Sequence, residues 1–143
     1  MRIVLDTNLW VSGLLWRGAP WRIVRLIEDG LVEAYATEAT IAELRRVLQY
    51  ARLQPRQREM RQTPDTLLSA VMRMSFIIAP VAIQPVITAD PKDDIFLACA
   101  LAAGAQYLVS GDSHLLDLGQ WRGIEMVTVN DFLAQHFPED TTQ

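Results

Sequence analysis

Residues 90–112 read DPKDDIFLACALAAGAQYLVSGD, and this stretch decides which fold we expect. Its apolar run starts after Asp94 and ends at Gly104, which predicts a buried helix with an Asp at its start and a left-handed Gly after its end. The residues QYLVS that follow predict a short strand, which stops at Gly111 and Asp112. Helix, tight turn, strand and acidic residue in this order are typical of a parallel α/β sheet, where ligands lie beyond the carboxyl ends of the strands.

Outside this stretch, strands and helices alternate along the whole chain. Apolar runs rich in β-forming residues predict strands or extended segments at residues 2–5, 31–36, 76–83, 106–110 and 124–129. Amphipathic or apolar runs between them predict helices at residues 9–16, 20–29, 40–50, 64–74, 94–103 and 131–137. Asn130 is the expected cap of the last helix, and residues 51–62 suit a polar helix or an exposed loop. The right-handed crossover rule then places a parallel sheet between layers of helices.

Length and composition limit the class of protein. The 143 residues suit one domain, which we expect over residues 1–137, and the polar tail 138–143 is expected to be disordered. The single Cys99 excludes an internal disulfide and a Cys-rich zinc site, and a lone cysteine suits the reducing cytoplasm. We expect Cys99 to be a small buried apolar residue. No apolar run reaches the roughly 20 residues that a membrane helix needs. The net charge of −4 argues against a protein that coats nucleic acid through a generally positive surface.

Four carboxylates are expected at one edge of the sheet. Asp6 and Asp112 follow strand ends, Asp94 starts a helix, and Glu43 lies near the start of another helix. Each also has a purely structural interpretation: Asp6 and Asp94 as helix caps, Asp112 as a turn residue, and Glu43 as the partner of Thr40 in a capping box. Without a cation, gathered carboxylates repel and raise one another's pKa. A hard divalent cation such as Mg²⁺ removes this repulsion, which favours a metal site that hydrolyses phosphodiesters.

Four motifs follow one another along the chain: IVLDTN near the amino terminus, TIAELRRVL with Glu43, the stretch 90–112, and the closing GIEMVTVNDFL. In this order they resemble those of the PIN-domain nucleases and, within them, the VapC-like toxins of bacterial toxin–antitoxin pairs. The resemblance implies a three-layer α/β/α sandwich with a central parallel sheet of about four or five strands. It also implies a cytoplasmic endoribonuclease that needs Mg²⁺ or Mn²⁺ and hydrolyses RNA with a metal-activated water.

The resemblance assigns the catalytic and metal-binding roles to four residues: Asp6, Glu43, Asp94 and Asp112. It further implies that Asn8 supports Asp6 and that Ser110 fills a hydroxyl position where the family often has Thr. Asp93 is an alternative or an assistant to its neighbour Asp94. We favour Asp94 because it directly precedes the IFLACA run, as in the family's pattern.

Substrate and partner surfaces are suggested by the arginines. Between Arg45 and Arg61 lie six Arg and one acidic residue, so this segment is locally positive, and the planar fork of Arg suits phosphate. As a hypothesis, five arginines line the approach of RNA to the carboxylates: Arg17, Arg22, Arg45, Arg46 and Arg52. The alternative is a solvated helix face. The resemblance adds a homodimer and a cognate antitoxin protein as expected partners.

Two other functions are compatible with these acidic residues. A metal-dependent phosphatase of an α/β fold also collects Asp residues at parallel strand ends. However, the haloacid-dehalogenase type needs Asp-x-Asp where this chain has Asp6-Thr7-Asn8. It also needs a Lys near the end of a later strand, whereas the only Lys, Lys92, lies in the turn before a helix. A non-catalytic PIN scaffold that binds protein partners would be indicated by the loss of an acidic position, and none is lost.

Three further polar residues lie near the site motifs in the sequence. Asp90 and Asp117 are candidates for its outer positions. The two histidines do not form a zinc signature, and we expect a surface or structural role for His114.

Overall fold

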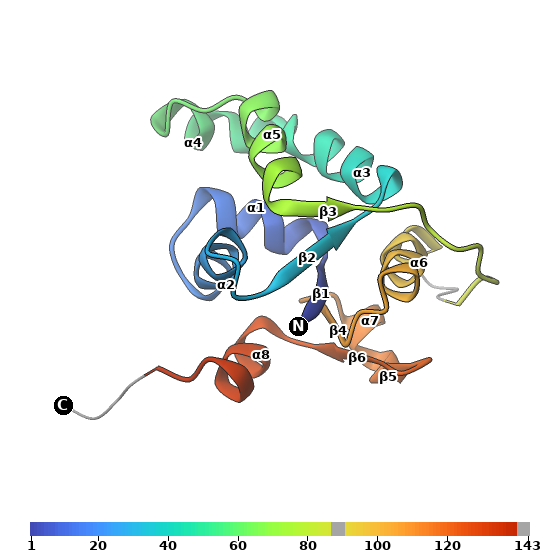
Figure 1. Ribbon diagram of the computed structural model, residues 1–143. Helices are drawn as coiled ribbons and strands as arrows, with labels where there is room; N and C mark the ends of the chain where they lie inside the picture. The colour runs from blue at the N-terminus through green and yellow to red at the C-terminus, as the bar shows by residue number, and fades with distance from the viewer. Residues whose placement is uncertain (87–90, 140–143) are drawn as a thin grey trace.

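A central sheet organises the molecule, as shown by the computed structural model, which describes residues 1–86 and 91–139 (Figure 1). Its strands are β1 Arg2–Leu5, β2 Glu33–Ala36, β3 Ser75–Ile77, β4 Tyr107–Val109, β5 Gln120–Trp121 and β6 Ile124–Val127. Their order across the sheet is β3-β2-β1-β4-β6-β5. Neighbouring strands are parallel, except that the short β5 pairs antiparallel with β6. The expected parallel α/β sheet is therefore confirmed, and β5 is an edge strand that the sequence patterns did not predict.

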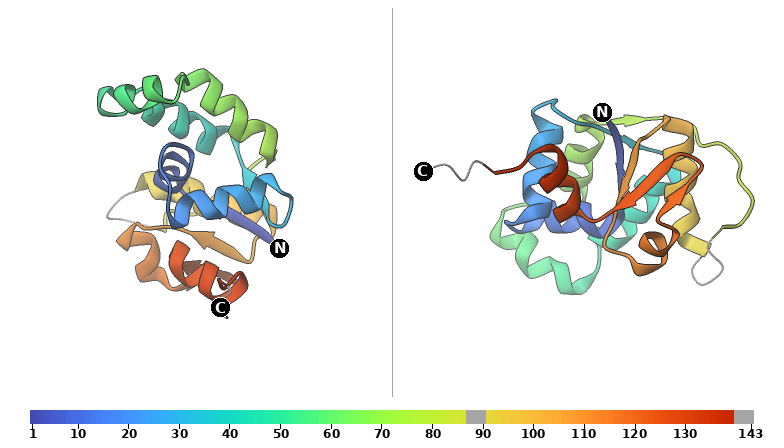
Figure 2. Two further views of the ribbon diagram at one scale, coloured as in Figure 1. Left: turned by 90° about the vertical axis from the view of Figure 1, so that its left-hand side faces the viewer. Right: turned by 90° about the horizontal axis from the view of Figure 1, so that it is seen from below.

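Helices cover both faces of this sheet. The described α-helices are α1 Thr7–Leu15, α2 Ala19–Glu28, α3 Glu38–Leu48, α4 Gln54–Glu59, α5 Pro64–Met74, α6 Asp94–Ala103, α7 Ser113–Leu118 and α8 Val129–His136. Two short 3₁₀ helices cover Ala51–Leu53 and Pro91–Asp93. Helices α1, α2, α3, α5 and α8 contribute to one hydrophobic core, whereas α6 and α7 contribute to a second. Figure 2 shows α1 and α2 on one side of the strands and α6 on the other, which confirms the three-layer sandwich.

Strand β1 lies at the centre of both cores. Ile3 and Leu5 belong to one core and Val4 to the other, and at most 2% of each residue is exposed. Successive side chains of a strand point to opposite faces, so a strand that is apolar throughout is buried on both sides. This burial fixes the end of β1, and with it the position of the residue that follows.

Helix α6 is the buried helix expected within residues 90–112. Cys99 on this helix is fully buried, and burial raises the pKa of its thiol to about 12, as expected for an inert core residue. Gly104 ends the helix in the left-handed conformation, with φ of 62°. Strand β4 follows directly, so the start of α6 and the end of β4 lie at the same edge of the sheet.

Local signals misplaced two elements near the carboxyl end of the sheet. The cap of α8 is Thr128, whose hydroxyl oxygen accepts a hydrogen bond from the Asp131 N–H at 3.1 Å. The prediction that Asn130 caps this helix is therefore wrong, because the helix already starts at Val129. Helix α7 was not predicted, since SGDSHL reads locally as a turn.

Within the described ranges, no helix is long and apolar enough to cross a membrane.

The expected tail is described only in part. Residues 140–143 of this tail lie outside the described residues, as does Asp90. Pro138 and Glu139 have no regular secondary structure, and Glu139 forms an ion pair with Arg22 at 3.4 Å. A single domain over residues 1–137 stays a prediction.

Candidate active site

The site begins where the strand order reverses. From β1 the chain passes outward to β2 and β3, whereas β4 lies on the opposite side of β1 and is followed outward by β6. Open α/β sheets bind ligands at the carboxyl ends of the strands that flank such a switch point. The last residues of the two strands, Leu5 and Val109, are register partners. The residues that follow them, Asp6 and Ser110, are therefore brought together.

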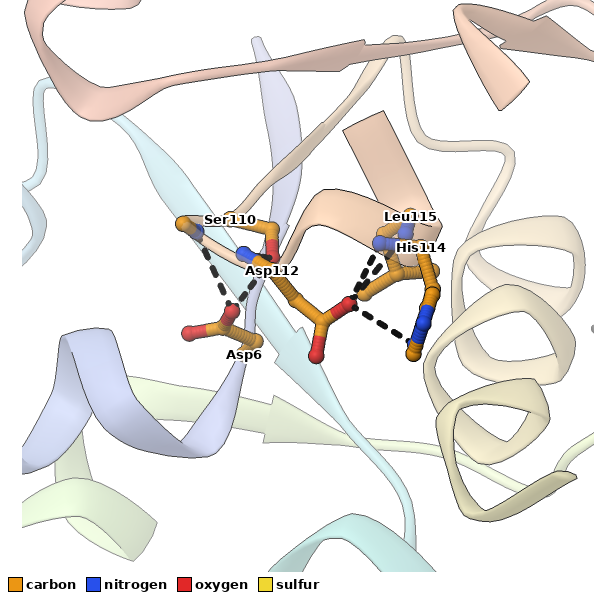
Figure 3. A network of polar contacts seen from close by, with 6 residues as sticks. Asp6, Ser110, Asp112, His114 and Leu115 are labelled. Atoms are coloured by element: carbon orange, nitrogen blue, oxygen red, sulfur yellow. Dashed lines mark hydrogen bonds and ion pairs between the residues drawn. The ribbon is translucent and has the colours of Figure 1, made fainter. Parts of the chain in front are cut away.

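Asp6 is the buried acidic residue of this edge, with 6% of the residue exposed. One carboxylate oxygen accepts a hydrogen bond from the Leu9 N–H at 2.9 Å, which caps α1. The other accepts a short hydrogen bond from the Ser110 hydroxyl and a longer one, 3.4 Å, from the Gly111 N–H (Figure 3). Desolvation by burial raises the pKa of Asp6, and it outweighs these hydrogen bonds, which lower it. The nearby charge of Asp112 raises the pKa further.

Ser110 connects Asp6 to Asp112. Its fully buried hydroxyl donates to Asp6 and accepts the Asp112 N–H at 2.9 Å. Asp112 in turn caps α7, because its Oδ1 accepts the His114 N–H at 2.7 Å and the Leu115 N–H at 3.4 Å. Its Oδ2 accepts no hydrogen bond from the part of the chain that the structure describes. This oxygen is thus available to a ligand.

Asp93, Asp112 and His114 form a group that can hold a metal ion. One ligand atom from each lies within 4.8 Å of the other two. Asp93 is 9% exposed and occupies the cap position of α6 without a capping hydrogen bond from its side chain. The His114 Nδ1 lies 3.7 Å from the Asp112 Oδ1, and Figure 3 shows the ring beside that carboxylate. Two carboxylates and an imidazole, spread only slightly wider than the roughly 4 Å across a Mg²⁺ coordination shell, fit a small divalent cation.

Asp94, the residue favoured from the sequence, faces a different environment. Its Oδ2 accepts the Val86 N–H at 3.0 Å, and its side chain lines a small pocket of mainly apolar residues that includes Ile83 and Ala98. Successive residues of a helix are turned by about 100°, so neighbouring side chains at the start of α6 point in different directions. The structure brings Asp93, and not Asp94, into the group with Asp112. A metal-binding role for Asp94 stays a prediction.

Glu43 lies in the second turn of α3 and is paired with an arginine. The Arg46 guanidinium donates to both of its carboxylate oxygens, at 2.6 and 3.2 Å. Glu43 is not part of the three-residue group described above. Its structural interpretation also fails, because the capping box of α3 is formed by Thr37 and Thr40 rather than by Thr40 and Glu43. The role of Glu43 in metal binding stays a prediction.

Asn8 does not support Asp6 through a hydrogen bond in this structure. Asn8 is exposed, and its side chain forms no hydrogen bond with any residue in the described ranges. The support of Asp6 comes instead from Ser110 and from backbone N–H groups. A supporting role for Asn8 stays a prediction.

Two of the predicted RNA-binding arginines lie at a groove between α2 and α8. The groove holds about 670 Å³ and is lined by Arg17, Trp21, Arg22 and Phe137, among others, but by none of the predicted carboxylates. The Arg17 guanidinium lies 4.7 Å from the Trp21 ring centre. Arg22 donates to the Phe137 carbonyl at 3.0 Å and pairs with Glu139. Both arginines therefore have structural contacts of their own.

The remaining three predicted arginines lie on or just after α3. Arg46 and Arg52 each approach the ring of Tyr50, at 5.4 and 5.5 Å from its centre, and Arg45 is exposed. Arg46 also donates to the Tyr50 hydroxyl at 2.5 Å. Tyr50 thus orders two cations that are close to Glu43 in the chain.

His114 is the residue of this group that sequence reasoning gave a structural role. The missed signal was helical: a residue two positions after an N-cap Asp lies in the first turn, where its N–H bonds the cap. Because α7 was not predicted, this relation between Asp112 and His114 was not visible. In the structure, this helical spacing places the His114 ring next to the Asp112 carboxylate.

The fold and this group of side chains define the class of protein, a parallel α/β domain with an acidic site at its switch point that suits a divalent cation. A family model for the PIN domain matches residues 2–114, most of the chain and all of the site, and the chain belongs to this family. PIN domains are typically metal-dependent nucleases, which agrees with the donor set. A comparison with curated proteins found no match.

Proposed function

We propose that this PIN domain is a cytoplasmic metal-dependent endoribonuclease, and that it is the toxin of a toxin–antitoxin pair. The observation that carries the nuclease proposal is the grouping of Asp93, Asp112 and His114 next to the buried Asp6 at the switch point. The toxin role rests on the resemblance of the sequence motifs to VapC-like proteins.

The carboxylates of Asp93 and Asp112 would hold the cation, Mg²⁺ or Mn²⁺. When bound, it supplies positive charge to the phosphate oxygens and lowers the pKa of water. The free Oδ2 of Asp112 and the carboxylate of Asp93 supply the negative charge that attracts it. Glu43 and Asp94 are the alternative ligands indicated by the sequence, and the variants described below test Asp94 against Asp93.

Asp6 would act on the water that attacks phosphorus. A raised pKa of Asp6 lies closer to neutral pH, and a general base works best when its pKa is near the pH of the reaction. Its carboxylate oxygens each have two lone pairs, so the hydrogen bonds from Ser110 and the backbone leave room for one more donor. Ser110 would hold this carboxylate in position.

The ends of helices α1 and α6 add a reason to expect a phosphate substrate. Both helices begin at residues of the site, directly after Asp6 and Asp93. Helix amino termini carry partial positive charge and unpaired N–H groups, which favour anions. An RNA phosphate next to the cation would meet both.

Arg45, Arg46 and Arg52 are the arginines that we retain for RNA binding. Tyr50 between Arg46 and Arg52 offers a ring on which a base can stack beside two cations. Arg17 and Arg22 remain candidates for contacts at the groove between α2 and α8. A homodimer and an antitoxin that covers the acidic site complete the proposal.

The test is RNA cleavage by two neighbouring variants, Asp93→Asn and Asp94→Asn. Each removes one charge from the same turn of the chain. With Mg²⁺ or Mn²⁺, the Asp93 variant should lose about 10²-fold or more in cleavage rate, since a group that acts on developing charge contributes about that much. The Asp94 variant should retain most of the activity, because its carboxylate accepts the Val86 N–H and an amide oxygen can do the same.

The controls separate the outcomes. EDTA should stop cleavage by the wild type, and circular dichroism should show that both variants are folded. The reverse order of activities would assign the site to Asp94. A folded wild type that cleaves no RNA with either metal, but hydrolyses a phosphomonoester, would replace the nuclease proposal with a phosphatase. For the toxin role, expression of the wild type should arrest bacterial growth and the Asp93 variant should not.

A further inference from the structure

We propose that His114 is a direct metal ligand and that it makes Mn²⁺, rather than Mg²⁺, the preferred cation of this site. The inference rests on the proposed function, because it concerns the same group of Asp93, Asp112 and His114. It adds a role for a residue outside the acidic set, and it chooses between the two cations.

The position of the ring is the first argument. The backbone N–H of His114 is bonded to the Asp112 Oδ1 at 2.7 Å, so the start of α7 fixes the ring next to that carboxylate. The Nδ1 to Oδ1 distance of 3.7 Å is too long for a hydrogen bond. Neither ring nitrogen forms a hydrogen bond with any residue in the described parts of the chain. The Nδ1 atom therefore lies beside the carboxylate, and an imidazole nitrogen with a lone pair is a metal ligand.

The exposure of the three side chains is the second argument. Asp93 is 9% exposed, whereas 44% of the His114 side chain and 33% of the Asp112 side chain are accessible. The group therefore has a closed side, at Asp93, and an open side, at His114. A cation can enter from solvent on the open side, and a substrate oxygen can share its coordination there.

The chemistry of the donor atoms is the third argument. Mg²⁺ binds oxygen ligands and keeps several waters. Imidazole nitrogen suits transition metals, and affinities for mixed nitrogen and oxygen sites increase from Mn²⁺ along the first row. Replacing one oxygen ligand by nitrogen thus weakens Mg²⁺ relative to Mn²⁺. A site of two carboxylates and one imidazole should select Mn²⁺ when both cations are present.

The experiment measures metal binding to purified protein without RNA. Titration calorimetry gives the affinities for Mn²⁺ and for Mg²⁺ in the wild type and in three variants: His114→Ala, His114→Asp and Ser113→Ala. The Ala variant should lose about tenfold or more in Mn²⁺ affinity, because even mutations of residues that only support metal ligands cost about that much. The loss of Mg²⁺ affinity should be smaller. The Asp variant supplies oxygen instead of nitrogen, so it should shift the preference toward Mg²⁺. The exposed Ser113 is the control, and its variant should match the wild type.

A spectroscopic measurement tests the ligand directly. Pulsed electron paramagnetic resonance of bound Mn²⁺ should show coupling to a histidine nitrogen in the wild type and not in the His114→Ala variant. The chain has two histidines, so His136 remains in that variant as an internal control.

The two possible failures are distinguishable. Mn²⁺ that binds without nitrogen coupling, and with an unchanged preference in the Ala variant, would overturn the role of His114 and leave the nuclease proposal intact. No binding of either cation to the folded wild type would overturn the metal site itself, and with it both proposals. Nitrogen coupling that is lost together with the Mn²⁺ preference supports the inference.

Discussion

The helices of this protein begin in two different ways. Three of them have a Thr cap whose neutral oxygen accepts a backbone hydrogen bond: Thr37 for α3, Thr63 for α5 and Thr128 for α8. Three others have Asp in the cap position: Asp6 for α1, Asp93 for α6 and Asp112 for α7. Thr and Asp are both good caps. Capping alone therefore does not explain why the Asp residues belong to the carboxyl edge of β1 and β4.

The two kinds of cap also differ in their effect on stability. A Thr cap satisfies a backbone N–H without a charge. Asp6 is a nearly buried charge whose pKa is raised by desolvation. Groups that destabilise the fold are retained where function needs them. The comparison thus separates a structural set of helix starts from the set for which we propose a function.

The Asp6→Asn variant should give the largest effect. Its amide oxygen can still accept the Leu9 N–H, so the cap is kept while the charge is lost. We expect RNA cleavage to fall by about 10²-fold or more. In EDTA, loss of the buried charge should stabilise the fold by about 1 kcal/mol and raise the melting temperature by about 4 °C. The exposed Asp29 provides the matched control, since Asp29→Asn should change neither quantity.

The free energies of unfolding of the wild type and the Asp6→Asn variant should depend differently on pH. Because the pKa of Asp6 is raised in the folded protein, the native state binds more protons than the unfolded state between the ordinary Asp pKa and the raised one. Stability from this group therefore decreases as pH rises through that window. In EDTA, the advantage of Asp6→Asn in free energy of unfolding should be largest near neutral pH and should shrink as pH falls. Urea denaturation at several pH values measures it, and an advantage that grows toward acid pH would contradict the assignment.

Ser110→Ala should give an intermediate effect. The change removes the hydroxyl that donates to the Asp6 carboxylate and accepts the Asp112 N–H, so Asp6 loses a side-chain partner and the backbone of Asp112 loses its acceptor. We expect cleavage to fall by about tenfold, which corresponds to a loss of about 1.4 kcal/mol in transition-state stabilisation. Ser110→Thr keeps the hydroxyl and is the matched control. Equal activity of both variants and the wild type would show that Ser110 only fills space.

Most of the fold followed from local patterns in the sequence. Strand β1, helix α6 and strand β4 are short apolar runs bounded by Gly or Asp, and each was expected within one or two residues of its observed bounds. The proximity of Asp6 and Ser110 also follows, since both come directly after neighbouring parallel strands. These features depend on residues close together in the chain.

The details of the site depend on directions that no local pattern contains. Whether Asp93 or Asp94 faces Asp112 is decided by the turn at which α6 begins, and a shift of one residue rotates a side chain by about 100°. The pairing of Glu43 with Arg46 was available from the sequence, because residues three apart on a helix are neighbours. That spacing would have shown a competitor for the Glu43 carboxylate.

Thr63→Ala should give the smallest effect and tests the structural side of the comparison. The change removes the oxygen that accepts the Thr66 N–H at 3.1 Å, which should cost about 1 kcal/mol of stability. Cleavage measured well below the melting temperature should be unchanged, and Thr63→Asp should restore the lost stability. If the Ala variant lost activity while folded, the division between the two kinds of cap would fail. Recovery in the Asp variant would show that an exposed Asp caps as well as Thr, so that burial beside Asp112, rather than the cap itself, distinguishes Asp6.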